Sequence, residues 1–169
     1  MATNNVEFDW PKVYQALGLG AEFGCDSGSL AAESNPQYWD VPVIKGVTSN
    51  IVVRALRDLG VKVSLYINNL DKAVPTNDRG PAGGSYLVRF RRTVEADPEL
   101  ADKSANDLAQ NGTQGITLLE RFLPGLAYFL ATGNHLDIEN MTLCSGSRDS
   151  DGRVPCVDWN PGYRELYVY

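Results

Sequence analysis

The sequence has few of the residues that metal centres and disulfide scaffolds require. It contains one histidine and three cysteines. A structural zinc site needs three or four Cys, His or carboxylate ligands, usually paired at short spacing, so none is expected. The odd count, Cys25, Cys144 and Cys156, is typical of a reduced protein, although a bridge between Cys144 and Cys156 across a hairpin stays open.

A long uninterrupted apolar run is also missing. The most apolar stretch, residues 116–131, contains Glu120, Arg121 and Pro124, and it falls short of the roughly 18 apolar residues that a membrane span requires. We therefore expect a buried helix and no membrane partner. The first nine residues lack the basic and apolar segments of a signal peptide, which predicts a cytoplasmic location.

Positive charge is in the minority. Fifteen Lys and Arg stand against 21 Asp and Glu, for a net charge of −6. Arg89, Arg91 and Arg92 form the one basic cluster, and three arginines do not neutralise a row of phosphates. We therefore expect no nucleic-acid partner. With 169 residues, 43% of them hydrophobic, the chain is long enough for one well-packed domain.

Hydrophobic periodicity and capping residues predict the order of the helices and strands. Helices are expected at residues 10–17, 49–59, 98–110 and 118–132, and strands at 61–67, 85–91, 141–145, 154–159 and 164–169. Residues 18–46 are predicted to be irregular, with at most a short turn of helix, and residues 68–84 to form a long polar loop. The pattern indicates a single α+β domain over residues 1–169, in which an antiparallel sheet packs on a central apolar helix with two or three further helices.

Helix ends carry specific signals. Asp9, Thr48 or Ser49, and Asp97 are candidate N-caps. Thr117 and Glu120 have the spacing of a capping box at the start of the apolar helix. Within that helix, Pro124 removes one intrahelical hydrogen bond, so a kink or a break is expected.

A series of short motifs follows in order from Asn77 to Trp159. They are Asn77-Asp-Arg79, Gly84-Ser-Tyr86, Val94-Glu-Ala-Asp97, Gly115-Ile-Thr-Leu-Leu-Glu-Arg121, Thr132-Gly-Asn-His-Leu-Asp137, Thr142-Leu-Cys-Ser-Gly-Ser-Arg148 and Asp151-Gly-x-Val-Pro-x-Val-x-Trp159. This region resembles an uncharacterised family of bacterial and environmental proteins with no established activity. Its C-terminal part, rich in Asn, Asp, Ser and Tyr, is also similar to the display surface of C-type-lectin-like variable proteins. The resemblance implies that relatives continue beyond Tyr169.

The chemistry of an enzyme would depend on the single histidine. His135 and Asp137 lie on the same side of an extended segment, but no nucleophile motif accompanies them. A helix C-terminal role for His135 is the alternative. The alternative function is that of a small hydrolase or transferase. It requires that one pocket is lined by Arg89, Arg91, Glu120 and His135.

The C-terminal strands carry the residue types that anchor interfaces, namely Tyr, Trp and Arg. Alternation places Tyr167 and Tyr169 on one face and Leu166 and Val168 on the other, so one set faces away from the core. Cross-strand stabilisation by aromatic rings is an equally ordinary use. Self-association is expected if the terminal strand is an uncovered edge.

We therefore predict a non-catalytic binding protein without cofactor or metal, whose partner is a small molecule or a protein. Asp149 and Asp151 begin like a calcium loop, but the closing acidic positions are missing, which favours a hairpin turn. Arg89 and Arg91 share a strand face, where they are suited either to hold an anionic group or to pair with Glu95, Asp97 or Glu120. The candidate binding residues are Arg89, Arg91, Arg148, Asp149, Asp151, Trp159, Tyr163, Arg164, Tyr167 and Tyr169.

Overall fold

The structure is a computed structural model that describes residues 4–30 and 35–169. Its α-helices are α1 (Trp10–Ala16), α2 (Gly20–Asp26), α3 (Ser49–Asp58), α4 (Leu70–Ala73), α5 (Ala105–Gln110) and α6 (Leu118–Thr132). Its strands are β1 (Tyr38–Val43), β2 (Lys62–Leu65), β3 (Thr76–Asn77), β4 (Tyr86–Arg91), β5 (Thr142–Leu143), β6 (Ser147–Arg148), β7 (Cys156–Asn160) and β8 (Glu165–Val168). The chain has the predicted α+β fold.

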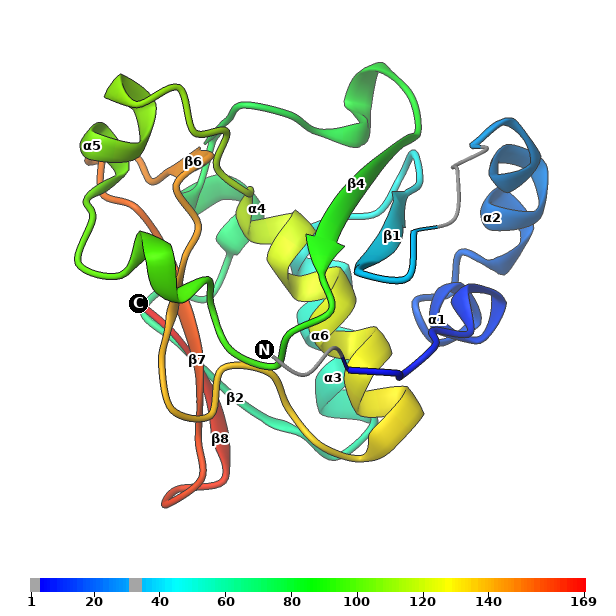
Figure 1. Cartoon of the computed structure of the whole chain (residues 1–169). Helices are drawn as coiled ribbons and strands as arrows, with labels where there is room; N and C mark the ends of the chain where they lie inside the picture. The colour runs from blue at the N-terminus through cyan, green and yellow to red at the C-terminus, as the bar shows by residue number, and fades with distance from the viewer. Residues whose placement is uncertain (1–3, 31–34) are drawn as a thin grey trace.

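Helix α6 occupies the centre, with the β1–β4 pair, α1 and α2 on one side and the C-terminal strands on the other (Figure 1). It begins at the predicted capping box, in which the backbone N–H groups of Glu120 and Thr117 donate to each other's side chains. It ends at Gly133, which has the left-handed φ of 73°. Pro124 does not divide it: the helix is continuous, because side chains on both sides of the proline, such as Phe122 and Leu126, are buried in the core.

The C-terminal sheet has the strand order β2-β8-β7-β5. The β7–β8 and β5–β7 pairs are antiparallel, as predicted. In addition, β2 pairs with β8 in parallel, with Lys62 opposite Glu165 and Leu65 opposite Val168. The sheet is therefore mixed, and β8 is an internal strand. The uncovered terminal edge on which self-association was expected does not exist.

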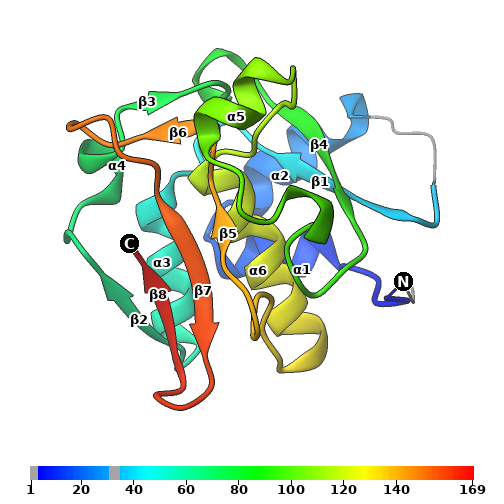
Figure 2. The same ribbon diagram turned by 60° about the vertical axis from the view of Figure 1, so that its left-hand side comes forward.

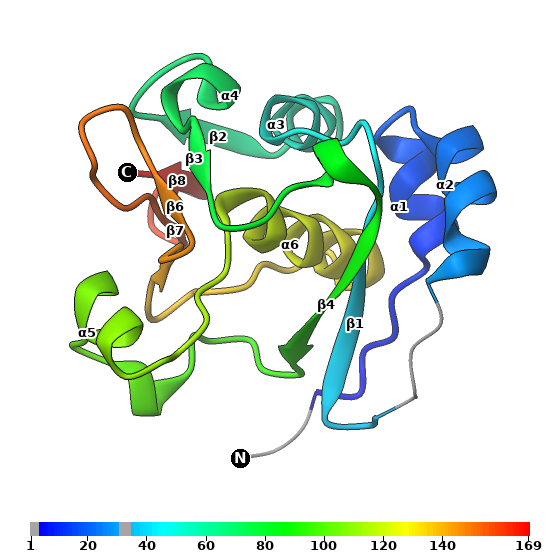
Figure 3. The same cartoon turned by 90° about the horizontal axis from the view of Figure 1, so that it is seen from above.

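Figure 2 shows this sheet in front of α3 and α6, with one face against the helices and the other turned outward. The inward side chains Val157, Leu166 and Val168 are buried. Viewed from above, α6 runs between the β1–β4 pair and the elements α3 and β2 (Figure 3). It contacts α3, β1 and α1, so the main core surrounds it.

The interpretation of residues 18–46 as irregular is wrong, because this stretch contains α2 and β1; residues 31–34 within it lie outside the described chain. Strand β1 is antiparallel to β4, from Tyr38 opposite Arg91 to Val43 opposite Tyr86. Pro42 weakened the strand signal, since proline donates no ladder hydrogen bond. The distant partner β4 stabilises the strand, and a local pattern does not reveal that partner.

Two further corrections concern the middle of the chain. The loop at 68–84 contains α4 and β3, and β3 pairs with β6. The helix predicted at 98–110 is only a 3-10 turn at Pro98–Leu100 followed by α5. Asp102 adopts a left-handed φ of 59°, which stops the first turn. Asp97 precedes that turn without a side-chain cap hydrogen bond, and Ser104 is the N-cap of α5. The helices α2 and α4, in segments predicted to lack regular helices, give the described chain more helices than expected.

Candidate functional site

The outer face of the C-terminal sheet presents a group of tyrosines. Because residues opposite one another in register share a face, Ser64, Tyr167 and Asp158 form one outward row. Tyr169 exchanges backbone hydrogen bonds with Cys156 in the next row. We call Tyr66, Tyr163, Tyr167 and Tyr169 the tyrosine face.

The rings of Tyr163, Tyr66 and Tyr169 are accessible, and Tyr167 contacts both Tyr163 and Tyr169. Tyr163 is 70% exposed, Tyr169 53% and Tyr66 42%. The ring of Tyr167 lies 5.8 Å from that of Tyr169 and 6.5 Å from that of Tyr163, measured between centroids. The patch combines large aromatic area with polar hydroxyl groups, which is the chemistry of interface anchors.

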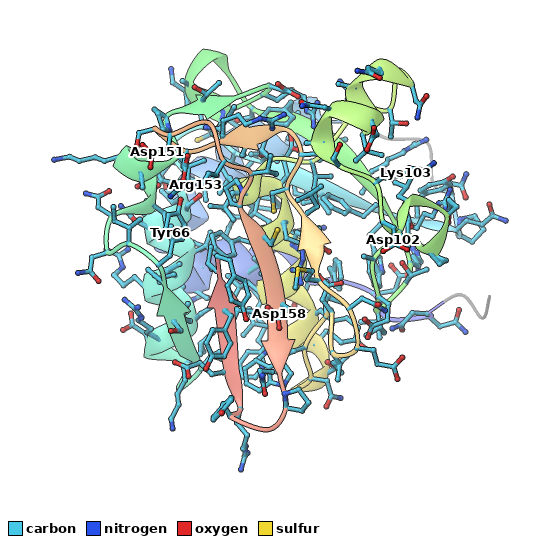
Figure 4. All side chains as sticks on the ribbon, turned by 90° about the vertical axis from the view of Figure 1, so that its left-hand side faces the viewer. Tyr66, Asp102, Lys103, Asp151, Arg153 and Asp158 are labelled. Atoms are coloured by element: carbon cyan, nitrogen blue, oxygen red, sulfur yellow. The ribbon has the colours of Figure 1, made fainter. Side chains whose placement is uncertain are left out.

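Charges of both signs border the tyrosine face. Lys62 stands opposite Glu165 in the register. Asp158 lies in front of β7, and Asp151 and Arg153 lie beside Tyr66 (Figure 4). The pKa of Asp158 is raised by partial burial and by the negative charge of Asp137, while a hydrogen bond from Tyr169 opposes that shift. The border is thus mixed in charge although the chain as a whole is acidic.

Other predicted site residues have internal partners. Trp159 points inward, and its ring stacks on His135 at 3.5 Å between centroids. Arg148 donates to the backbone carbonyls of Ser145 and Ser147. Arg164, in contrast, is exposed in the β7–β8 turn with a left-handed φ of 53°.

Asp149 is buried and closes the turn that was compared with a calcium loop. Its Oδ1 accepts the backbone N–H groups of Asp151 and Arg153. Asp151 also pairs with the Arg153 side chain at 3.3 Å, and both are exposed. Within residues 4–30 and 35–169, no group of three or more His, Cys, Asp or Glu side chains is placed to bind a metal ion.

Arg89 and Arg91 lie away from the tyrosine face, on the wall of a cavity. Arg89 pairs with Asp40 at 2.8 Å, and Arg91 pairs with Glu99 and, at 3.5 Å, with Asp97. Pairing of Arg91 with Asp97 was one of the expected alternatives.

The four residues required for the alternative hydrolase or transferase function do not share one pocket. Glu120 is fully buried, accepts two hydrogen bonds from Arg79 and one from the Tyr86 hydroxyl, and does not line the cavity. His135 lies between aromatic rings and likewise does not line it.

The cavity has a volume of about 770 Å³. It lies between the end of β4, the segment 93–103, α5, α6 and β5. Asp102 and Lys103 are exposed lining residues at its rim, and in Figure 4 they lie across the strands of the sheet from Tyr66. Pockets of about 300–1,000 Å³ are typical of small-molecule sites.

A buried ion pair on the cavity wall was missed in the sequence analysis. Arg121, on α6, donates through Nε to Asp137 Oδ2 at 2.8 Å, and both side chains are at least 96% buried. The Thr142 hydroxyl donates to the same oxygen at 2.5 Å. The signal was an arginine within an almost wholly apolar helix, because a buried charge requires a partner.

Several of the short motifs noted in the sequence meet around the start of α6. Gly146 donates to the carbonyl of Ile116 at 2.8 Å, where the two chain segments cross. Ser147 Oγ accepts the N–H of Leu118 and donates to Asn77 Oδ1. Arg79 reaches the carbonyl of Gly115 as well as Glu120. These contacts build the junction between loop, helix and sheet.

No protein-family model, curated protein or solved structure matches this chain. Among the helices of the described residues, none combines the length and apolar character needed to cross a membrane. The site must therefore be interpreted from its own geometry.

Proposed function

We propose that this protein is a non-catalytic binding protein that associates through the tyrosine face, with a second copy of the chain as the partner. The observation that carries the proposal is the exposure of Tyr163, in the β7–β8 turn, and of Tyr169, directly after β8, which are 70% and 53% exposed. Both rings flank Tyr167 on a sheet whose other face is in the core. Exposed aromatic clusters with a polar border are typical of protein interfaces.

The mixed border favours a second copy over an oppositely charged partner. A two-fold dimer brings the same patch together with itself, so the patch must be self-complementary. Lys62 and Arg164 supply positive charge beside Glu165 and Asp158. A two-fold arrangement is therefore able to place opposite charges against each other around the tyrosines. The face, rather than the edge of β8, is then the contact.

Sedimentation velocity across a wide range of protein concentrations tests this proposal. We expect the wild type to form dimers, and the double variant Tyr163→Ser/Tyr169→Ser to require at least about tenfold more protein for the same dimer fraction. Both residues are exposed, so the fold should persist. Leu59→Ser and Ile138→Ser are matched controls, because each removes an apolar side chain that is 40% exposed elsewhere.

A wild type that stays monomeric at the highest concentration contradicts the proposal. So does a double variant that dimerises as well as the wild type. Equal weakening by the two control variants also contradicts it, because the effect would then be general loss of apolar surface.

A further inference from the structure

We infer that the cavity beside α6 is a binding site for a small uncharged molecule that has an apolar body and one hydroxyl or N–H donor. The inference does not depend on the tyrosine face. It rests on the buried Asp137 carboxylate, the neutralising Arg121 and the apolar side chains that make up much of the wall.

The first argument is the free acceptor. Oδ2 of Asp137 accepts hydrogen bonds from the side chains of Arg121 and Thr142. The other oxygen, Oδ1, accepts no hydrogen bond from the described residues. It is also not one of the polar atoms that are both unpaired and fully enclosed by protein. Oδ1 therefore keeps contact with solvent, and Asp137 lines the cavity. A carboxylate oxygen accepts hydrogen bonds only, so a donor on the ligand is required.

The second argument is that this acceptor is held in place. The backbone of Asp137 has a left-handed φ of 55°, donates to Val94 O at 2.8 Å and accepts from Trp159 N at 2.9 Å. Its side chain is fixed by Arg121 and Thr142. A ligand donor therefore meets a preorganised oxygen, which lowers the entropic cost of binding.

The third argument concerns charge. The guanidinium of Arg121 neutralises Asp137 within the buried wall. The other charged lining residues already have partners or lie at the rim: Arg89 pairs with Asp40, Arg91 pairs with Glu99 and Asp97, Glu95 accepts backbone N–H groups of residues 138–140, and Asp102 and Lys103 are exposed. A charged ligand in the buried part would therefore be desolvated without a free countercharge there. Apolar side chains, among them Phe90, Leu108 and Leu136, form much of the remaining wall. This combination selects a neutral amphipathic molecule rather than an anion or a cation.

The probes for a test are 2-naphthol, 2-methoxynaphthalene and 2-naphthoate, added to the full chain and followed by calorimetric titration. They share one apolar ring system, but only 2-naphthol is an uncharged donor. We expect saturable binding of 2-naphthol and about tenfold weaker binding of the ether, because the ether leaves Asp137 Oδ1 unpaired. The naphthoate should also bind more weakly than 2-naphthol.

Two measurements locate the site. Ala96→Trp introduces an indole at a residue that lines the cavity, whereas Ala109→Trp places the same group on the exposed surface of α5, off the lining. We expect the first variant to lose 2-naphthol binding and the second to keep it. Cys156 also lines the cavity, so saturating 2-naphthol should slow its alkylation in a Cys25→Ser background.

The inference is overturned by an absence of saturable 2-naphthol binding, by equal binding of the ether, or by tighter binding of the naphthoate. Unchanged 2-naphthol binding in Ala96→Trp would show that the ligand does not bind in the cavity. If that variant does not fold, an alkylation rate of Cys156 that 2-naphthol leaves unchanged would show the same. Alkylation is measured at a single low protein concentration, because Cys156 lies beside Tyr169 and association through the tyrosine face would itself protect the thiol. Loss of 2-naphthol binding in the Tyr163→Ser/Tyr169→Ser variant would also overturn the inference.

Discussion

The imidazole of His135 lies against the indole of Trp159, with ring centroids 3.5 Å apart and planes 12° from parallel. Phe129 also stacks on the imidazole, at 5.0 Å. Burial, and secondarily the positive charge of Arg121, lower the pKa of His135 to about 4. The ring is therefore neutral at pH 7, so it does not supply a cation to the C-terminal end of α6.

The stability of the protein should fall as the pH decreases from about 6.5 towards 4. The lowered pKa of His135 means that the unfolded chain binds the proton more readily than the folded one, so the stabilisation is present above the ordinary value of 6.5 and is lost on acidification. Because the ring is partly exposed, we expect a loss of about 1–2 kcal/mol. An NMR titration of the single histidine gives its pKa, and His135→Phe should reduce the pH dependence measured by urea unfolding. A titration midpoint near 6.5 would contradict this prediction.

The ion pair between the half-buried Arg79 and the fully buried Glu120 should be essential for stability. Glu120 is fully buried and holds Arg79 at 2.8 Å together with the Tyr86 hydroxyl. Removing one partner leaves the other charge unpaired, so Arg79→Met should lower the free energy of unfolding by about 3–5 kcal/mol. The control Arg153→Met removes an exposed pair and should cost less than about 1 kcal/mol. Urea unfolding of both variants measures these losses. Similar losses of unfolding free energy in the two variants would contradict the prediction that the burial of Glu120 makes its ion pair more important.

Gly146 should not tolerate a side chain. A Cβ atom there would lie 2.9 Å from the carbonyl oxygen of Gly115 and 3.0 Å from Ile116, both backbone atoms. We expect Gly146→Ala to lower the free energy of unfolding by about 1–3 kcal/mol through overpacking. Gly24→Ala is the matched control, because open space surrounds Gly24 and it lies inside α2. Thermal unfolding of the two variants compares them, and an unchanged melting temperature for Gly146→Ala would show that the crossing is not tightly packed.

The three cysteines should react with thiol reagents at different rates and form no internal bridge. Cys25 is exposed, Cys156 half-buried and Cys144 buried, and all three are free thiols. Leu143 stands opposite Cys156 in the register, so Cys144 points to the other face of the sheet, away from Cys156. Burial also raises the pKa of the Cys144 thiol.

The rate of labelling by 5,5′-dithiobis(2-nitrobenzoate) measures this order. We expect Cys25 to react first, Cys156 more slowly and Cys144 only after unfolding in urea. Cys25→Ser should abolish the fast phase alone. A disulfide between Cys144 and Cys156, found by mass spectrometry of the non-reduced protein, would contradict the register.

Parts of the fold that depend on neighbouring residues could be predicted from the sequence. Thr48 caps α3 and Gly60 follows its end with a φ of 86°, as the pattern indicated. The capping box of α6 was predicted as well, and so was the placement of Tyr167 and Tyr169 on one face of the last strand with Leu166 and Val168 on the other. In each case the signal lies within a few residues, because helix caps and strand alternation are local properties of the backbone.

The candidate site was only partly visible in the sequence. Tyr163 and Tyr169 are exposed as expected, whereas Trp159 packs inward on His135. The alternation that placed Trp159 did not identify a ring on another segment as its partner. The Arg121–Asp137 pair joins residues 16 positions apart across the end of α6, and no periodic pattern signals such a contact.

The sequence by itself determined where α3 and α6 begin and end and which side chains of the last strands share a face, since these follow from hydrogen bonds within a turn and from the two-residue period of a strand. Only the tertiary structure decided that β2 joins β8, that β1 pairs with β4, and that a cavity opens between β4, α5 and α6. These features depend on contacts between distant segments, whose free energy comes from burying surfaces together.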